Sequence, residues 1–215
     1  MSSKTDSLPF ELGKTYYGGN AQLAIDIANS TLKGAELLGV TFEKEDVDEG
    51  DTTTPFVKPY RSYCRRRLMA VRNLSGITLH RKRLVRLKVS GLSVVGTLDG
   101  YATNVDEPHA YPLDEFLSPT IGLPNGDIGY IVVYGPAMCL TDLAGGVLNV
   151  IADGDVLGAL TGSTTGATTS GRVYTVNTAA SSNTGNALLN SIGWAMSAKT
   201  TGQSNGDVLV FIRQH

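Results

Sequence analysis

The sequence is poor in residues that anchor large cores or cross-link chains. Only 7% of its 215 residues are aromatic, it has one tryptophan, and its two cysteines, Cys64 and Cys139, lie far apart. That spacing gives neither a disulfide framework nor a metal-binding pattern, so buried free thiols are favoured. No hydrophobic run approaches the ~18 apolar residues of a membrane span, and residues 1–10 lack the apolar segment of a secretory signal. We therefore expect a soluble protein, made in a cytoplasm, with no membrane partner.

Acidic residues are absent between Thr52 and Leu98. Eleven of the eighteen Lys and Arg residues lie in that stretch, and an acidic block from Glu43 to Asp51 precedes it. The formal net charge of −2 hides this separation. Segregated charge indicates a surface that meets another part of the protein or another molecule.

Three kinds of partner would match the basic stretch. Nucleic acid is the least favoured, because Tyr60 and Tyr63 interleave with the arginines but no recognition helix or RNA-binding signature accompanies them. Pairing with the acidic block would orient segments rather than stabilise them, since exposed ion pairs contribute only about 0–1 kcal/mol each. Docking onto an acidic protein surface, where charge sets register and rate, is compatible with such pairing. The candidate interface residues are Arg61, Arg65, Arg66, Arg67, Arg72, Arg86, Lys88, Tyr16 and Tyr17.

Strand-sized hydrophobic runs dominate the chain after residue 60. The 25 glycines and eight prolines indicate many turns. The run Leu84–Val89 alternates, with Arg86 and Lys88 on one face, and the run Ile128–Tyr134 is apolar on both faces, as in a central strand. Further strand-like runs lie at 68–72, 94–98, 137–140, 148–150, 156–160, 172–176, 192–196 and 208–212. This pattern predicts a mainly β fold, either a β-barrel or a β-sandwich.

The segments between these runs carry turn and loop signals. Asp99-Gly100 is expected to form a turn, and Gly135-Pro136 is expected to end the strand that begins at Ile128. The Gly/Ser/Thr-rich stretch 161–171 is expected to be an exposed loop. Residues 1–20 are interpreted as an extended arm and 43–59 as an acidic loop, while 21–38 fit either one short helix or a short strand. The predicted organisation is an N-terminal arm and acidic linker over 1–60 and a β-rich body over 61–215.

Catalytic patterns in the sequence are weak. Gly13-Lys14-Thr15 resembles the end of a phosphate-binding loop, but Leu8 stands where that loop requires glycine. The histidines have no metal-ligand spacing; they are His80, His109 and His215. A set of carboxylates could serve sugar cleavage, although solvated loops are commonly acidic; they are Asp99, Asp106, Glu107, Asp114 and Glu115. We therefore predict a non-enzymatic protein with no catalytic, metal or cofactor site.

Four elements occur in a fixed order between Ala70 and the C-terminus. They are Val71–Leu79 (R-N-x-S-G-x-x-L), Gly129–Pro136 (G-Y-x-V-x-x-G-P), Ala152–Leu157 (x-x-G-D-x-L) with Gly171-Arg172-Val173 after it, and the closing pair Ile192–Met196 and Val208–Ile212. In this order they resemble the small β-rich structural proteins of tailed phages, namely the capsid decoration (cement) and head-fibre proteins. Residues 1–69 have no counterpart in the resemblance.

The resemblance implies a virion structural protein that decorates and stabilises a bacteriophage capsid by binding its outer shell. Its partner would be the major capsid protein, and it would be a homo-oligomer, with a trimer favoured. It would be made in the host cytoplasm and reside on the capsid surface. One alternative is a fibre or adhesion module that recognises a host surface ligand, against which the single tryptophan, Trp194, argues. A polysaccharide-cleaving enzyme is the other.

Overall fold

A computed structural model describes residues 12–13, 15, 38–45, 65–90, 93–103, 109–141, 150–159, 170–176, 191–199 and 207–213. Ten strands and no helix occur among these residues, which confirms the prediction of a mainly β fold. The expectations for the arm and for a helix at 21–38 fall almost entirely outside them. So do three of the candidate interface residues, Arg61, Tyr16 and Tyr17.

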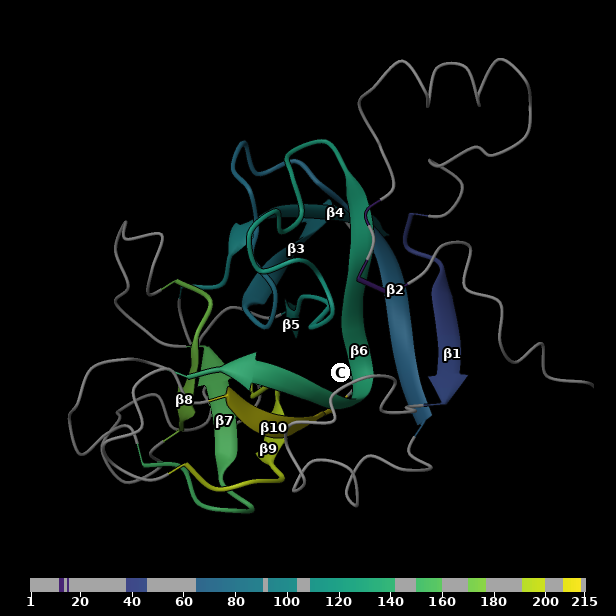
Figure 1. Cartoon of the computed structure of the whole chain (residues 1–215). Coiled ribbons are helices and arrows are strands. Elements are labelled where there is room, and N and C mark those ends of the chain that lie inside the picture. Colours follow the sequence, from purple (N-terminus) through teal and green to yellow (C-terminus); the bar gives the residue numbers. More distant parts are fainter. Residues whose placement is uncertain are drawn as a thin grey trace, which may run out of the picture.

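All ten strands of the described residues belong to one open sheet (Figure 1). Its order is β5-β3-β4-β2-β6-β10-β9-β7-β8, and β1 pairs with β2 beside this path. The strands are β1 (Thr41–Glu45), β2 (Arg65–Asn73), β3 (Leu84–Ser90), β4 (Ser93–Tyr101), β5 (Ala110–Pro112), β6 (Ile128–Leu140), β7 (Val156–Ala159), β8 (Val173–Thr175), β9 (Gly193–Ala195) and β10 (Asp207–Ile212). Most predicted runs thus contain a strand, because their apolar alternation matches the two-residue period of the sheet.

The long strand β6 belongs to both halves of the sheet. Its first part pairs with β2, and its second part, from Gly135 onward, pairs with β10. Figure 1 shows β6 following β2 and then turning into the group formed by β7 to β10. The half that holds β2 to β5 curls back on β6, because Leu113 bridges Ile131 and the Asp114 N–H donates to the Tyr130 carbonyl at 3.0 Å. This half is therefore barrel-like, although the whole sheet stays open.

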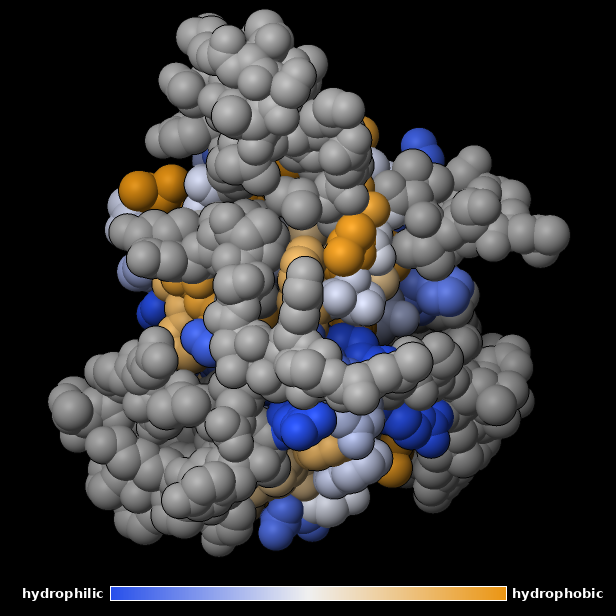
Figure 2. All heavy atoms as spheres, turned by 90° about the vertical axis from the view of Figure 1, so that its right-hand side faces the viewer, coloured by the Kyte–Doolittle hydropathy of each residue, from blue (hydrophilic) through white to orange (hydrophobic). Residues whose placement is uncertain are grey.

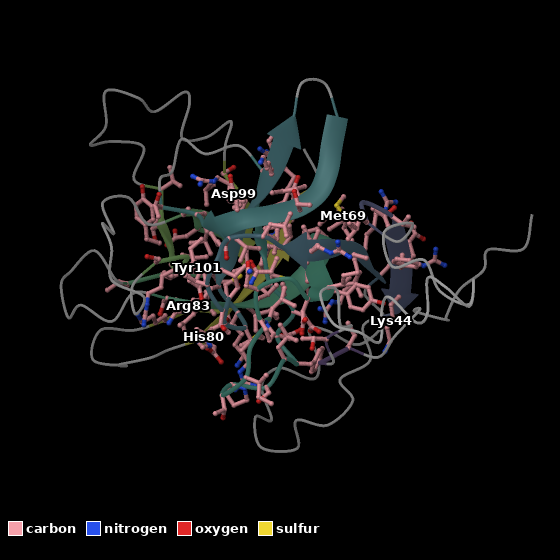
Figure 3. The ribbon with its side chains drawn as sticks, turned by 90° about the horizontal axis from the view of Figure 1, so that it is seen from above. Lys44, Met69, His80, Arg83, Asp99 and Tyr101 are labelled. Carbon is pink, nitrogen blue, oxygen red and sulfur yellow. The ribbon has the colours of Figure 1, made fainter. Side chains whose placement is uncertain are left out.

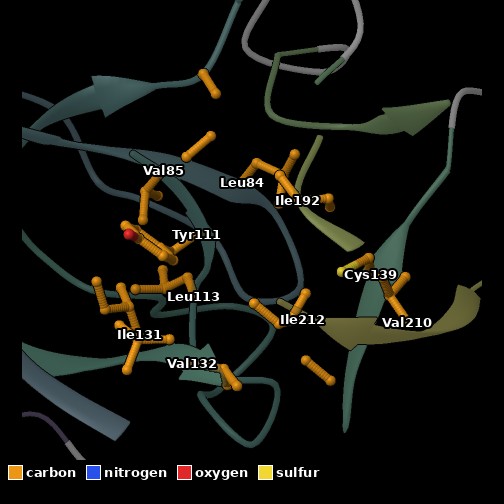
Figure 4. Close-up of a cluster of buried hydrophobic side chains, with 14 of the residues drawn as sticks. Leu84, Val85, Tyr111, Leu113, Ile131, Val132, Cys139, Ile192, Val210 and Ile212 are labelled. Carbon is orange, nitrogen blue, oxygen red and sulfur yellow. The ribbon is translucent and has the colours of Figure 1, made fainter. Parts of the chain in front are cut away.

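The two halves share one hydrophobic core. Val85, Leu113 and Ile131 contribute from the curled half, and Cys139 and Ile212 contribute from the other (Figure 4). The β6–β10 pairing sets this arrangement, because Val208, Val210 and Ile212 alternate inward opposite Cys139, Ala137 and Gly135. Removing such apolar area from water contributes roughly 25 cal/mol per Å² and is the main force that holds the bent sheet together.

The Gly135-Pro136 pair does not end a strand, so that prediction was wrong. The strand β6 continues through both residues to Leu140. Gly135 has a φ of 95°, and a Cβ there would overlap the Arg65 carbonyl oxygen. Glycine thus lets the strand bend and approach β2 closely without losing its partners.

The Asp99-Gly100 pair is also not a turn. Both residues lie inside β4, where Arg86 pairs with Gly100 and Leu87 pairs with Leu98, so Asp99 is the extra residue of a β-bulge. The Asp99 Oδ1 atom accepts a hydrogen bond from Arg86 Nε at 2.7 Å. The alternation predicted for β3 is confirmed, since Leu87 is buried and Lys88 is exposed.

Two predicted loops begin or end in ordered, paired backbone. Thr41–Glu45 forms β1, so the loop expected from residue 43 starts later, and residues 46–59 lie outside the described part. At the other loop, Ser170 and Gly171 are buried rather than exposed. The Gly171 carbonyl accepts from the Leu84 N–H at 2.6 Å, which ties this end to β3. In both loops, pairing with residues distant in sequence sets where the ordered backbone begins or ends, and amino-acid composition does not predict such pairing.

Candidate functional site

The start of β2 and the edge strand β1 present a group of charged side chains, which we call the basic edge and define as Glu43, Arg65 and Arg67. Arg67 Nη2 lies 2.8 Å from Glu43 Oε1, whereas Arg65 Nη1 lies 3.8 Å from Glu43 Oε2 and its side chain is 68% exposed. The hydrogen bond and charge of Arg67 lower the pKa of Glu43. Figure 2 turns this side toward the viewer and shows hydrophilic side chains gathered in its middle and lower part. Internal pairing, one of the three interpretations of the basic stretch, thus occurs at Glu43.

Arg66 points to the opposite side of β2 and is only 2% exposed. Its Nη1 atom lies 2.8 Å from Glu115 Oε1, and its guanidinium carbon lies 5.7 Å from the centre of the Phe116 ring. The second oxygen of Glu115 accepts the Met138 N–H at 3.2 Å. A buried guanidinium needs such a partner, so Arg66 serves the interior and is not open to an external one.

The other predicted interface residues lie away from the basic edge. Arg72 is at the far end of β2, where it pairs in register with Thr97 of β4. Its Nε and Nη2 atoms are buried and have no hydrogen-bond partner in the described part of the chain. Arg86 and Lys88 lie on β3, which β4 separates from β2. Of the predicted residues that the structure describes, Arg65 and Arg67 lie together, whereas Arg66, Arg72, Arg86 and Lys88 lie elsewhere.

Aromatic side chains form a continuous surface that the sequence analysis missed. The Tyr134 and Phe211 rings lie 5.3 Å apart at 85°, and the Trp194 and Phe211 rings stack at 4.8 Å and 14°. Tyr134 is 39% exposed and Trp194 is 42% exposed. Tyr134 also stands opposite Arg67 in the β2–β6 register, so this surface adjoins the basic edge. These residues come from three strands that are distant in sequence, so only the pairing order reveals them.

The carboxylates weighed for sugar cleavage have structural partners. Asp114 is fully buried and accepts the Gly13 N–H at 2.7 Å and the Phe116 N–H at 3.0 Å. Burial raises the pKa of Asp114, and the hydrogen bonds from Gly13 and Phe116 oppose that rise. Asp99 pairs with Arg86 and Glu115 with Arg66. Asp106 and Glu107 lie outside the described residues.

Three titratable residues gather at the end of the curled half, on the opposite side of Figure 3 from Lys44 and Met69. The His80 N–H donates to the Tyr101 hydroxyl at 2.7 Å, and the Arg83 guanidinium carbon lies 5.2 Å from the Tyr101 ring centre. Burial, assisted by the Arg83 charge, lowers the pKa of His80. The cluster fixes the segment before β3 against β4.

Metal-ligating side chains do not gather in groups of three or more within the described ranges. In the same ranges no helix is long and apolar enough to cross a membrane. Comparison with protein-family models found no match, and comparisons with curated proteins and with solved structures found no similar chain. The resemblance to capsid decoration proteins therefore stays a prediction from the sequence.

Proposed function

We propose that this chain is a non-enzymatic virion structural protein that decorates and stabilises a phage capsid by binding its outer shell. The observation that carries the proposal is the basic edge on a β body. Arg65 projects from β2 with two thirds of its side chain exposed, and its ion pair within the described residues is a long one, 3.8 Å to Glu43. Arginine is enriched at the energetic centres of protein interfaces, because its fork matches carboxylates. The partner would be an acidic surface of the major capsid protein.

The geometry of the edge suits docking onto a large acidic surface. Glu43 and Arg67 face each other on adjacent strands, so the sheet fixes their spacing. An approaching carboxylate would find Arg65 available and would share Arg67 with Glu43. Such rim charges mainly accelerate and orient association, so binding should weaken as salt rises.

One observation favours the second candidate, a fibre or adhesion module that recognises a host surface ligand. Trp194 is exposed, and exposed tryptophan rings commonly stack on sugars. However, Phe211 stacks on one face of Trp194 with a 14° tilt, so that face is not available to a sugar. Trp194 keeps 42% of its surface exposed, so a glycan array decides between a sugar and a protein partner.

Binding to mature capsids that lack decoration, taken from the virus that encodes the chain, tests the proposal. We expect the wild-type protein to co-sediment with such capsids and Arg65→Glu to weaken binding at least tenfold. Lys88→Glu is the matched control, because it reverses another exposed charge, on β3 and away from the basic edge, and should bind like the wild type. If the wild-type protein did not bind the capsids, the proposed capsid function would be wrong. Hits on a glycan array would then support the adhesion module. If Arg65→Glu and Lys88→Glu weakened capsid binding equally, the basic edge would not be the specific contact.

A further inference from the structure

Arg72 is a cation whose buried donors have no partner. It lies near the end of β2, and the residue as a whole is half-buried. Its Nε and Nη2 atoms are buried, and neither has a hydrogen-bond partner in the described part of the chain. The ion pairs found among the described residues belong to other arginines and to Lys82. A guanidinium stays charged and keeps its donors, so burying them unpaired is strongly unfavourable.

The backbone around Arg72 is fixed by neighbours on both sides of β2. Arg72 pairs in register with Thr97 of β4 on one side and with β6 on the other. Two residues earlier, the Ala70 carbonyl accepts the Gly39 N–H at 2.9 Å, so the segment before β1 also reaches this point. That segment lies against β4, since a Cβ on Gly96 would overlap the Gly39 nitrogen. Arg72 thus starts from a rigid backbone, which can hold a ligand group in fixed geometry.

Two further donors accompany Arg72 on the same side of the sheet. Thr97 stands directly opposite Arg72 and therefore points to the same side. The next residue, Leu98, points into the core, where it pairs with the buried Leu87 of β3. Lys88 follows Leu87, so it points to the side of Thr97, and it is exposed. We call Arg72, Thr97 and Lys88 the Arg72 site.

The chemistry of the unpaired donors indicates what binds them. Nε and Nη2 lie on one edge of the guanidinium and donate in parallel, the arrangement that binds two oxygens of one carboxylate or phosphate. The carboxylate of β4, Asp99, accepts from Arg86 at 2.7 Å, so it balances Arg86 rather than Arg72 or Lys88. Water would accept the two hydrogen bonds but leave the charge uncompensated. An oxyanion supplies both acceptors and the opposite charge.

We propose that the Arg72 site binds the oxyanion group of a ligand, a phosphate or a carboxylate. The Arg72 edge donates to two of its oxygens, the Thr97 hydroxyl supplies a further hydrogen bond, and the Lys88 ammonium attracts the anion from the surface. The proposal does not require capsid binding, because Arg65 lies at the opposite end of β2. Loss of capsid binding with anion binding retained would therefore overturn the proposed function and leave this inference standing.

Titration of the full-length wild-type protein with two probe anions tests this inference. Inorganic phosphate and acetate each replace chloride at constant ionic strength near neutral pH, and calorimetry measures their binding. We expect saturable binding of at least one probe, at one ion per chain, with a Kd of about 10 mM or tighter. The probe that binds more tightly tells whether the ligand carries a phosphate or a carboxylate. Weaker binding of both probes than this limit would overturn the proposal.

Variants localise the bound anion. Arg72→Met removes the fork and should abolish saturable binding, and Arg72→Lys keeps the charge without the fork and should weaken binding at least about tenfold. Arg81→Met is the matched control, because it makes the same change at a half-buried arginine in the turn before β3, and it should bind like the wild type. Wild-type affinity in Arg72→Met would overturn the proposal. If circular dichroism shows that Arg72→Met does not fold, Thr97→Val, which removes only the hydroxyl, replaces it, and unchanged affinity in that variant would contradict the site.

Discussion

Arg66 and Glu115 form an ion pair that is almost completely removed from solvent, with 2.8 Å between Nη1 and Oε1. Arg66 comes from the start of β2 and Glu115 from the segment after β5. The second Glu115 oxygen accepts the N–H of Met138, in the part of β6 beyond its bend. One carboxylate thus connects both halves of the sheet at the point where β6 changes partners.

Removal of this carboxylate should destabilise the protein strongly. Glu115→Ala removes the carboxylate that pairs with the buried Arg66 guanidinium and accepts the Met138 N–H, and losses of about 3–5 kcal/mol are typical of such changes. Urea unfolding measures the effect. Arg65→Ala is the control, since its exposed pair with Glu43 should change stability by no more than about 0.5 kcal/mol. Equal midpoints for the two variants would contradict a structural role for the pair.

Sequence periodicity predicted the strands of the body but not their partners. The alternation of Leu84–Val89 depends only on local spacing, and β3 confirms it. Dipeptides such as Gly135-Pro136 and Asp99-Gly100 occur both in turns and in bent or bulged strands. The pairing with neighbouring strands, which the local sequence does not show, decides which of the two forms. The consecutive arginines at 65–67 face alternate sides because they lie within β2, whereas the predicted strand began at Leu68. Trp194 stands beside Phe211 because β9 and β10 pair in this register, which the sequence pattern does not reveal.

Gly135 should be essential for the bend in β6. Gly135→Ala forces a Cβ onto the Arg65 carbonyl and holds a non-glycine residue at a φ of 95°, so we expect a loss of about 2–4 kcal/mol from strain and displaced backbone together. Gly154→Ala is the control, since its φ of 87° imposes the same strain but nothing lies within 4 Å of the new Cβ. It should lose only about 1 kcal/mol in the same urea experiment. A Gly154 variant as unstable as the Gly135 variant would show that backbone strain alone matters.

Asp114 should make stability fall as pH rises above the ordinary range for aspartate. The unfolded carboxyl ionises near pH ~3.9, while burial raises the pKa of the folded one, so the folded state binds more protons between the two values. Its contribution is complete below the unfolded pKa and is lost as pH rises through the folded pKa. Asp114→Asn cannot ionise, so its stability relative to the wild type should improve as pH rises from about 4 through the folded pKa.

Glu43 supplies a control of opposite sign for this experiment. Arg67 lowers the pKa of Glu43, so the stabilisation from that carboxylate is present above its unfolded pKa and is lost as pH falls through the folded one. Relative to the wild type, Glu43→Gln should therefore improve as pH falls. Urea unfolding at several pH values measures both differences. A pH-independent difference for Asp114→Asn would contradict a raised pKa at Asp114.

Cys139 should be unreactive until β10 separates from β6 or the chain unfolds. Its thiol is fully buried between β6 and β10, and burial, together with the charges of Glu115 and Asp207, raises its pKa well above the ordinary value. The thiolate is the reactive form, so both access and ionisation protect this residue. In a Cys64→Ser variant, a thiol reagent at pH 8 should label Cys139 no faster than the chain unfolds, and at once in concentrated urea. Faster labelling under native conditions would show that β10 leaves β6 without global unfolding, which the shared core does not predict.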